Sequence, residues 1–175
     1  MPVHQIYTLS EPVLRHKAKK VKTFNQELKQ LTDDMVETMQ VSDGVGLAAP
    51  QIGVSERIVV IQIPEEYEDE EAGKLFVLIN PEITEASDEI LLADEACLSI
   101  PGIMGEVPRA SKIKVRAQNV KGKAIRVKAE GYLARVFQHE IDHLDGVLFI
   151  DRVENAETLR RVTPEGEVVP FEVPA

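Results

Sequence analysis

The segment Gly131–Leu144 reads GYLARVFQHEIDHL and predicts a helix with two histidines on one face. Residues four apart in a helix lie one above the other, so His139 and His143 can present two imidazoles to one ion. Glu140 stands beside them, about 100° round the helix. This pattern is typical of a helix that binds a metal ion. The simpler alternative is a helix whose two histidines are exposed or hydrogen-bonded. The helix also has a broad apolar arc, made of Leu133, Val136, Phe137, Ile141 and Leu144.

Two imidazoles do not complete a catalytic metal site, which normally has three protein ligands and one open position. The metzincin extension, H-E-x-x-H-x-x-G-x-x-H, is nearly present, because Gly146 occupies its glycine position. The position of the third histidine, however, is Phe149. The remaining histidines, His4 and His16, lie in polar N-terminal sequence and are more typical of ordinary surface or core residues than of ligands.

Other donors for a third ligand are few. A glutamate in the manner of thermolysin would have to be Glu165 or Glu167, in a Pro/Gly-rich tail that is a poor place for a rigid ligand. Cys97 is the remaining soft donor. A free cysteine is often only a small buried apolar residue, but the segment Glu95–Ser99, EACLS, precedes Ile100–Gly102 in a setting typical of a strand end or loop.

The composition describes a globular protein of ordinary domain size. The chain has 175 residues, of which 43% are hydrophobic, enough to bury a core. Its net charge of −10 argues against bulk electrostatic binding to nucleic acid or to an anionic membrane. The single cysteine excludes an intramolecular disulfide and indicates a reducing compartment. No apolar run approaches the roughly 18 residues of a membrane span, and no targeting segment is evident. We therefore expect a cytoplasmic protein with one catalytic domain over 1–175, of which 163–175 is an extended C-terminal tail.

Patterns of hydrophobicity favour the α+β class, with strands in the middle of the chain and helices on either side. Besides the helix described above, we expect a short helix near Glu11–His16 with Ser10 as N-cap, and one at about Asn25–Gln40 with a Thr23/Gln26 capping box. Expected strands are Arg57–Ile63, Leu75–Ile79, Ile113–Gln118 and Ala124–Ala129, the last two forming an antiparallel hairpin.

Charged residues are segregated along the chain. The first basic segment, residues 15–22, has five Lys or Arg, and the second, Arg109–Lys128, has eight; neither contains an acid. An acidic segment, Glu65–Glu71, has six carboxylates in seven residues. All three are typical of solvated surface. The alternative is that the basic segments form a local patch able to meet ribosomal RNA.

The segment Gly44–Gln51, GVGLAAPQ, has small residues that allow close approach of backbone, and is too apolar for a generic loop. It matches neither a P-loop nor a dinucleotide-binding fingerprint. By itself it is a weak signal, equally consistent with a tight turn.

Three motifs in this order, GVGLAAPQ at 44–51, EACLS at 95–99 and QHEIDHLDG at 138–146, make the chain resemble the peptide deformylase family. The resemblance extends from the N-terminal helix to about Arg152. The second motif usually has Gly where this chain has Ala96, and the amphipathic C-terminal helix of many members is not evident. The resemblance implies antiparallel or mixed β-sheets packed around a central helix that carries HExxH, with an N-terminal helix.

The resemblance implies that Cys97, His139 and His143 bind one divalent metal ion, with water in the fourth position. Iron(II) is the metal that the family implies for the native enzyme, and Zn(2+), Ni(2+) or Co(2+) are substitutes. Affinity order alone would favour zinc over iron at these ligands. A ferrous ion beside a thiolate would make the site sensitive to oxygen.

The resemblance also implies the reaction, which is hydrolysis of the N-terminal formyl group from formyl-methionine of newly made polypeptides, with release of formate. Glu140 would accept the proton of the attacking water, while the Gln51 side-chain amide and the Leu98 backbone N–H would help to hold the oxyanion. For substrate binding we expect the Gly46 backbone, with Val45 and Val136 as walls of the methionine pocket. Glu95 and Gln138 are interpreted as supports of the ligands.

Other functions stay open at this point. One is a zincin-type metallopeptidase that cuts internal peptide bonds and has a third ligand other than Cys97. The others are a non-catalytic metal-binding module and a ribosome-docking protein without activity. The predicted partners are an N-formyl-Met nascent peptide and the ribosome surface, met through the basic segments; DNA and membranes are not predicted partners.

Overall fold

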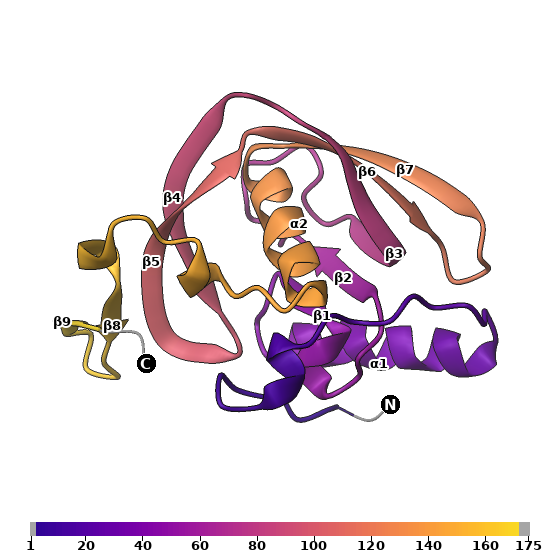
Figure 1. Cartoon of the computed structure of the whole chain (residues 1–175), viewed down its shortest axis with the longest axis horizontal. Helices are drawn as coiled ribbons and strands as arrows, with labels where there is room; N and C mark the ends of the chain where they lie inside the picture. The colour runs from indigo at the N-terminus through magenta and orange to yellow at the C-terminus, as the bar shows by residue number, and fades with distance from the viewer. Residues whose placement is uncertain (1–2, 172–175) are drawn as a thin grey trace.

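The computed structural model describes residues 3–171 and has a mixed α+β fold with antiparallel sheets (Figure 1), which confirms the predicted class. One sheet has the order β1-β2-β3-β6-β7, from Gly46–Ala48 (β1), Ile58–Gln62 (β2), Leu75–Ala86 (β3), Lys112–Gln118 (β6) and Ala124–Glu130 (β7). The other has the order β4-β5-β8-β9, from Ile90–Cys97 (β4), Ile100–Ala110 (β5), Arg160–Val162 (β8) and Val168–Pro170 (β9). The helices are α1 (Gln26–Val41) and α2 (Gly131–Leu144), with 3-10 turns at Pro12–Arg15, Ala49–Ile52, Phe149–Asp151 and Ala156–Thr158.

The predicted strands of the first sheet are present, and one of them is longer than predicted. β6 and β7 form the expected hairpin, with Lys112 opposite Glu130. β3 begins at the predicted Leu75 but continues to Ala86. The predicted strand ended at Ile79, directly before Asn80-Pro81, a pair that is typical of a turn. Instead, the strand accommodates the pair through a positive φ of 52° at Asn80 and a shift of register in its pairing with β6.

The long hairpin of β4 and β5 was not predicted. Most of β4 is exposed. Its sequence, ILLADEAC, therefore lacks the alternation of apolar and polar residues that indicates a half-buried strand. β5 contains Pro101, Gly102, Gly105 and Pro108, which are typical of loops. Pairing with β4 along nearly its whole length nevertheless keeps β5 extended.

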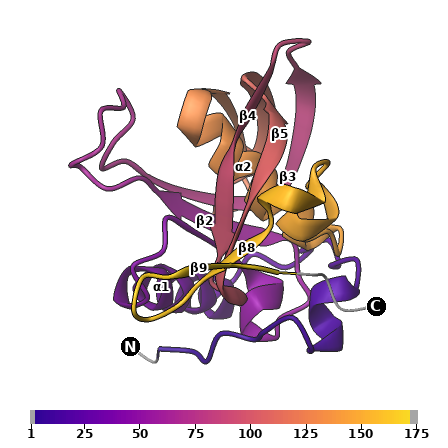
Figure 2. The same ribbon diagram turned by 90° about the vertical axis from the view of Figure 1, so that its left-hand side faces the viewer.

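Helix α2 lies between the two sheets (Figures 1 and 2). Its apolar arc packs in one core cluster with residues of β2, β3, β6 and β7, and Phe137 makes an edge-to-face contact with Phe76, with ring centroids 5.1 Å apart. Its opposite side is hydrogen-bonded to the other sheet. Arg135 donates to the carbonyl of Val107 at 2.8 Å, and Gln138 exchanges hydrogen bonds with the backbone of Ala110. The helix is therefore fixed from two directions.

Two predicted helix caps were wrong, although both helices begin within a residue of the predicted start. Asn25, not Thr23, caps α1, because its side-chain oxygen accepts a hydrogen bond from the Leu28 N–H at 3.0 Å. The short helix expected near Glu11–His16 is a 3-10 helix, Pro12–Arg15, and Glu11, not Ser10, precedes it without a side-chain cap.

The described part of the predicted tail, up to residue 171, contains β9, which pairs with β8. The rest of the tail, 172–175, lies outside the described residues. Within residues 3–171, no helix combines the length and the apolar character that a membrane crossing requires.

The N-terminal segment packs directly against the C-terminal end of α2. The Ala18 N–H and an Arg57 guanidinium N–H donate to the Leu144 carbonyl at 2.8 and 3.0 Å. Gly146, just beyond the helix, has a φ of +74°, and a Cβ there would lie 2.6 Å from the Arg15 carbonyl oxygen. The glycine permits this close approach, which holds the end of the helix where His143 lies.

Gly131, at the other end of α2, is a matched control for Gly146. Its φ is +59°, but a Cβ there would meet nothing within 4 Å. We expect Gly131→Ala to lower the free energy of unfolding by about 1 kcal/mol, from backbone strain alone. Gly146→Ala should cost about 1–3 kcal/mol more, because the backbone of residue 15 must move. Urea denaturation of both variants at equal metal content measures the difference, and equal losses would contradict the close approach.

Candidate metal centre

The predicted ligand residues are brought together from two elements that lie far apart in the sequence. Cys97 is the last residue of β4, and His139 and His143 lie one turn apart on α2. One ligand atom from each residue lies within 4.8 Å of the other two. The Cys97 Sγ and the His143 Nε2 are 3.4 Å apart. Among the described residues, this is the group of His, Cys, Asp and Glu side chains whose geometry could hold a metal ion.

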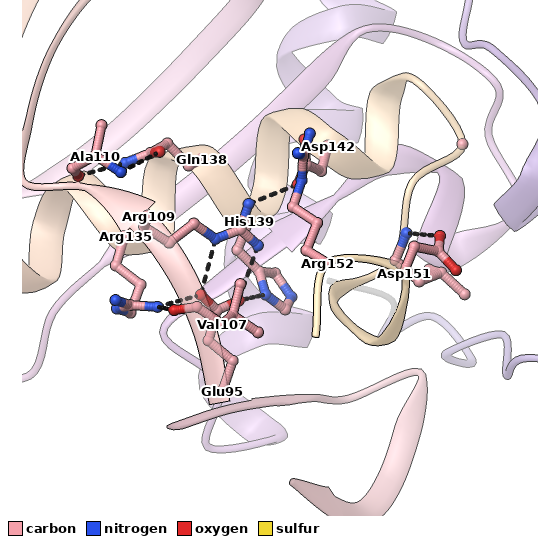
Figure 3. Close-up of polar contacts among 12 residues, drawn as sticks. Glu95, Val107, Arg109, Ala110, Arg135, Gln138, His139, Asp142, Asp151 and Arg152 are labelled. Carbon is pink, nitrogen blue, oxygen red and sulfur yellow. Dashed lines mark hydrogen bonds and ion pairs between the residues drawn. The ribbon is translucent and has the colours of Figure 1, made fainter. Parts of the chain in front are cut away.

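Glu95 fixes the orientation of the His139 ring. Its Oε1 lies 2.8 Å from the His139 Nδ1, so this nitrogen donates to the carboxylate and the Nε2 is left for a metal (Figure 3). Such a carboxylate orients a ligating imidazole and makes it a stronger base. The prediction that Glu95 supports a ligand matches this contact. Gln138, in contrast, is bonded to the Ala110 backbone and anchors α2 instead of supporting a histidine.

The Glu95 carboxylate is also held by two buried arginines, as Figure 3 shows. Arg109 donates to both of its oxygens, at 2.8 and 2.9 Å, and Arg135 donates to one, at 2.7 Å. Arg109 reaches on to Asp142 at 2.6 Å. Burial by itself would raise the pKa of Glu95, but the hydrogen bonds from Arg109 and His139 outweigh it and lower that pKa to about 2. Glu95 is thus ionised in the folded protein.

Arg109 corrects the interpretation of the second basic segment as surface. Only 4% of its side chain is exposed, and it lies inside the network around Glu95. Three other cations of this segment pair with acids on neighbouring strands, Lys112 with Glu130, Lys114 with Glu85 and Arg116 with Glu82. A sequence pattern could not reveal these partners, because pairing between strands brings them together.

Glu140 lies beside the ligand atoms with an unused acceptor. Its Oε1 is 3.9 Å from the His139 Nε2, and its buried Oε2 has no hydrogen-bond partner among the described residues. Burial raises the pKa of Glu140 to about 7, against the opposing effect of His139. A buried carboxylate of this kind is suited to accept and return a proton.

The donor set fits a divalent metal ion. Thiolate sulfur and imidazole nitrogen are the ligands of zinc and of other borderline metals. Burial would lower the pKa of His139, but its contacts with Cys97 and Glu95 hold it well above the usual value. Binding of a cation at the Nε2 would displace the proton of that nitrogen. Burial and the neighbouring His139 lower the pKa of His143, which keeps this imidazole in the neutral form that a metal requires.

A cavity of about 570 Å³ opens beside these residues. It is lined by eight of the nine predicted site residues, namely Val45, Gly46, Gln51, Cys97, Leu98, Val136, His139 and Glu140. The ninth, His143, is 1% exposed and lies behind the others. The structure thus places the predicted catalytic and substrate-binding residues around one space, while their roles stay predictions.

The glycine-rich segment forms one wall of this cavity. A Cβ on Gly46 would lie 2.8 Å from the Glu140 side chain, so the absence of a side chain lets β1 approach that carboxylate. Gln51 is buried, and its Oε1 accepts a hydrogen bond from the Ala48 N–H at 2.9 Å. Its Nε2 faces Ser99 Oγ at 3.1 Å and Cys97 Sγ at 3.6 Å. The segment is therefore part of the site.

Sequence reasoning missed several residues of the cavity. Tyr67, Met104, Tyr132 and Arg135 line it as well. A signal for Tyr132 was available, because it precedes Val136 by one helical turn and must share its face. No comparable signal marks Tyr67, which lies within the acidic segment.

The alternative third ligands lie elsewhere. Phe149, at the metzincin histidine position, stacks on His139 with ring centroids 6.0 Å apart. His4 faces Asp34 at 3.4 Å, and Glu165 and Glu167 are exposed next to β9. None of these, nor His16, belongs to the cluster of ligand atoms.

Comparison with known proteins identifies the family. The family model for polypeptide deformylase matches residues 3–159. The peptide deformylase of Thermomicrobium roseum is 48% identical over 168 residues, 95% of each chain. That of Halothermothrix orenii is 52% identical over 153 residues, 87% of this chain and 95% of its own. The crystal structure of the Thermotoga maritima peptide deformylase superimposes with a TM-score of 0.82 at 44% identity, and covers 89% of this chain and 100% of its own.

These findings do not support the zincin-type alternative. The identity extends over nearly the whole length of the curated relatives, and the three ordered motifs lie around one cavity. The chain belongs to the peptide deformylase family of enzymes.

Proposed function

We propose that the chain hydrolyses the formyl group from the N-terminal formyl-methionine of newly made polypeptides, and releases formate. The observation that carries this proposal is the buried Glu140 carboxylate, with a free acceptor oxygen, next to a Cys-His-His donor set on the same cavity. Membership of the family, which is metal-dependent, supports it.

Cys97, His139 and His143 would hold one divalent ion. Iron(II) is the proposed native metal, with Zn(2+), Ni(2+) or Co(2+) as substitutes, because a mixed thiolate and imidazole set accepts all of them. When bound, the ion supplies a water of lowered pKa and polarises the formyl carbonyl. The Glu95 carboxylate keeps the His139 Nε2 directed at it.

Glu140 would transfer a proton from the attacking water to the leaving amine. Its free oxygen accepts the proton of the attacking water, whose oxygen forms the new bond to the formyl carbon. When the C–N bond breaks, the same carboxylic acid delivers the proton to the leaving amine, so that charge and atoms balance. Glu140 lies on α2 with its side chain against Gly46 of β1, which keeps it next to both the ligands and the cavity.

Gln51 and Leu98 would stabilise the oxyanion. The Gln51 amide is held through its oxygen by the Ala48 N–H, which directs its NH₂ group toward Cys97. Leu98 occupies the turn between β4 and β5, directly after the cysteine. Two fixed donors on the same side of the reacting carbon would favour the charge that develops there.

The remaining cavity would bind the substrate. The proposal assigns the Gly46 backbone to a hydrogen bond with the peptide, and Val45 and Val136 to the walls around the methionine side chain. Both valines line the cavity, Val45 just before β1 and Val136 on α2. An apolar space with a few fixed polar groups is typical of a ligand site.

Contact with the ribosome through the basic segments stays a prediction. A separate cleft of about 650 Å³ is lined by Lys17 and Lys20 of the first basic segment and Arg116 of the second. The segments thus meet on one surface, although Arg116 pairs with Glu82. Co-sedimentation with ribosomes that weakens with added salt would support the contact. A substrate made on bacterial-type ribosomes is the reason to propose a cytoplasmic location.

Replacing Glu140 tests the central role. We expect Glu140→Ala to retain metal and to lose about 10²–10⁴-fold in kcat on an N-formyl-Met-Ala-Ser peptide, because the proton acceptor is gone. Formate release and bound metal should be measured on the same preparation. Turnover close to that of the unaltered protein would contradict the role of Glu140.

A second variant tests the role of Glu140 by displacing its side chain without replacing it. Gly46→Ala places a Cβ 2.8 Å from the Glu140 side chain and should displace it, with a loss of about 10²-fold in kcat at unchanged metal content. Gly44→Ala is the matched control. Its Cβ would meet only the end of the flexible Leu98 side chain, at 2.8 Å, so we expect a much smaller loss.

The metal ligands are tested by metal content. Cys97→Ser should lose tight binding, because a neutral hydroxyl replaces a thiolate. Elemental analysis after anaerobic purification measures both the stoichiometry and the identity of the metal. An unchanged stoichiometry in the variant would show that Cys97 is not a ligand, and zinc without iron in the unaltered protein would contradict iron(II) as the native metal.

A further inference from the structure

The acidic segment lies within a loop that joins β2 to β3, residues 63–74, and this loop is closed at its base. The Gly73 N–H donates to the Ile63 carbonyl at 2.7 Å, and the Gln62 side chain donates to the Gly73 carbonyl at 3.0 Å. Within the loop, the Tyr67 N–H donates to the Pro64 carbonyl at 3.1 Å. The loop therefore has a defined shape that fixes the direction of its single aromatic residue. It extends beyond the sheet toward the N-terminal end of α2 (Figure 2).

Tyr67 reaches from this loop to α2 and stacks on Tyr132. The two rings lie 5.5 Å apart between centroids, with 28° between their planes. Offset stacking of this kind is worth about 0.5–1.5 kcal/mol beyond the area that it buries. Burial, together with the neighbouring Tyr67, raises the pKa of Tyr132 to about 12, so the Tyr132 phenol is neutral near pH 7.

Both rings line the cavity of the candidate site. Tyr132 precedes Val136 by one turn of α2, so the stack continues the wall that the proposed function assigns to Val136. Tyr67 and Tyr132 are 44% and 39% exposed. Both residues thus line the cavity and are also partly open to solvent, as the outer wall of a binding space would be.

We propose that the Tyr67–Tyr132 stack is the outer wall of the space that holds the side chain of the formylated residue, and that it limits the size of that side chain. This inference rests on the proposed function. Because Tyr67 comes from a loop, the wall depends on both rings, and removing either one should open the space. We expect the flexible, unbranched side chain of methionine to fit beside the wall, and a rigid phenyl ring to be accepted better when the wall is absent.

The test compares kcat/KM on N-formyl-Met-Ala-Ser and N-formyl-Phe-Ala-Ser. We expect Tyr67→Ala and Tyr132→Ala each to lower the Met/Phe ratio by about 10-fold, in the range that a pocket contact provides. Tyr67→Phe keeps the ring and should stay within about twofold of the unaltered protein. The double alanine variant should lose no more than either single variant, since the two rings act as one wall.

Glu68→Gln combined with Glu70→Gln is the control within the same loop. Both side chains are exposed outside the cavity, so the Met/Phe ratio should not change. An unchanged ratio in both single alanine variants, with formate still released, would overturn the inference and leave the proposed function intact.

Binding measurements make the inference independent of turnover. In Glu140→Ala protein, calorimetry of the two formyl peptides should show the same loss of Met/Phe discrimination when Tyr67 is replaced by alanine. If the unaltered protein released no formate, the proposed function would be wrong. The ratio of the dissociation constants of the two formyl peptides would still show whether the Tyr67–Tyr132 stack limits the size of the bound side chain.

Discussion

The buried carboxylate of Glu95 is the group on which both the metal centre and the packing of α2 depend. It bonds to Arg109 on β5 and to Arg135 and His139 on α2, so one side chain of β4 joins three elements. Burying these charges is costly, and the cost is offset only because every carboxylate oxygen is hydrogen-bonded. Loss of the Glu95 carboxylate would leave the buried Arg135 guanidinium without the acid that it pairs with. The network therefore stabilises one arrangement of β4 against α2, and the distance from Cys97 to the two histidines follows from that arrangement.

Local spacing made the helix of the candidate metal centre and the β6–β7 hairpin predictable. His139, Glu140 and His143 are related by helical geometry alone, and alternation of apolar residues marks a hairpin with one wet face. The β4–β5 hairpin and the Glu95 network were not predictable in this way. Arg109 and Arg135 are 14 and 40 positions from Glu95 in the sequence, and nothing in a local pattern relates them. The resemblance to a family supplied Cys97, for which spacing offered only a weak argument.

Two glycines of the motifs are explained by the groups that pack against them. Gly46 leaves room for the Glu140 side chain, and Gly146 leaves room for the Arg15 backbone. In each case the neighbour comes from a distant part of the chain, so a sequence pattern can show that a small residue is present but not what it accommodates. The same holds for Ala96, where the family usually has Gly. This residue lies on β4 and lines the cavity, so its methyl group is accommodated in an extended strand.

The floor and the outer wall of the cavity are held by different physical means. The floor, with Cys97, His139 and Glu140, is fixed by a buried network of charges and by strand pairing, and a change there disturbs the whole interior. The wall depends on one aromatic stack between a helix and a loop that is closed by its own hydrogen bonds. A loop of this kind can change in sequence at little cost to the fold. If the stack forms the proposed wall, selectivity for the side chain of the formylated residue can change without a change in the hydrolytic groups. The groups that would recognise the substrate and the groups that would cleave it line one cavity, but different interactions hold them in place.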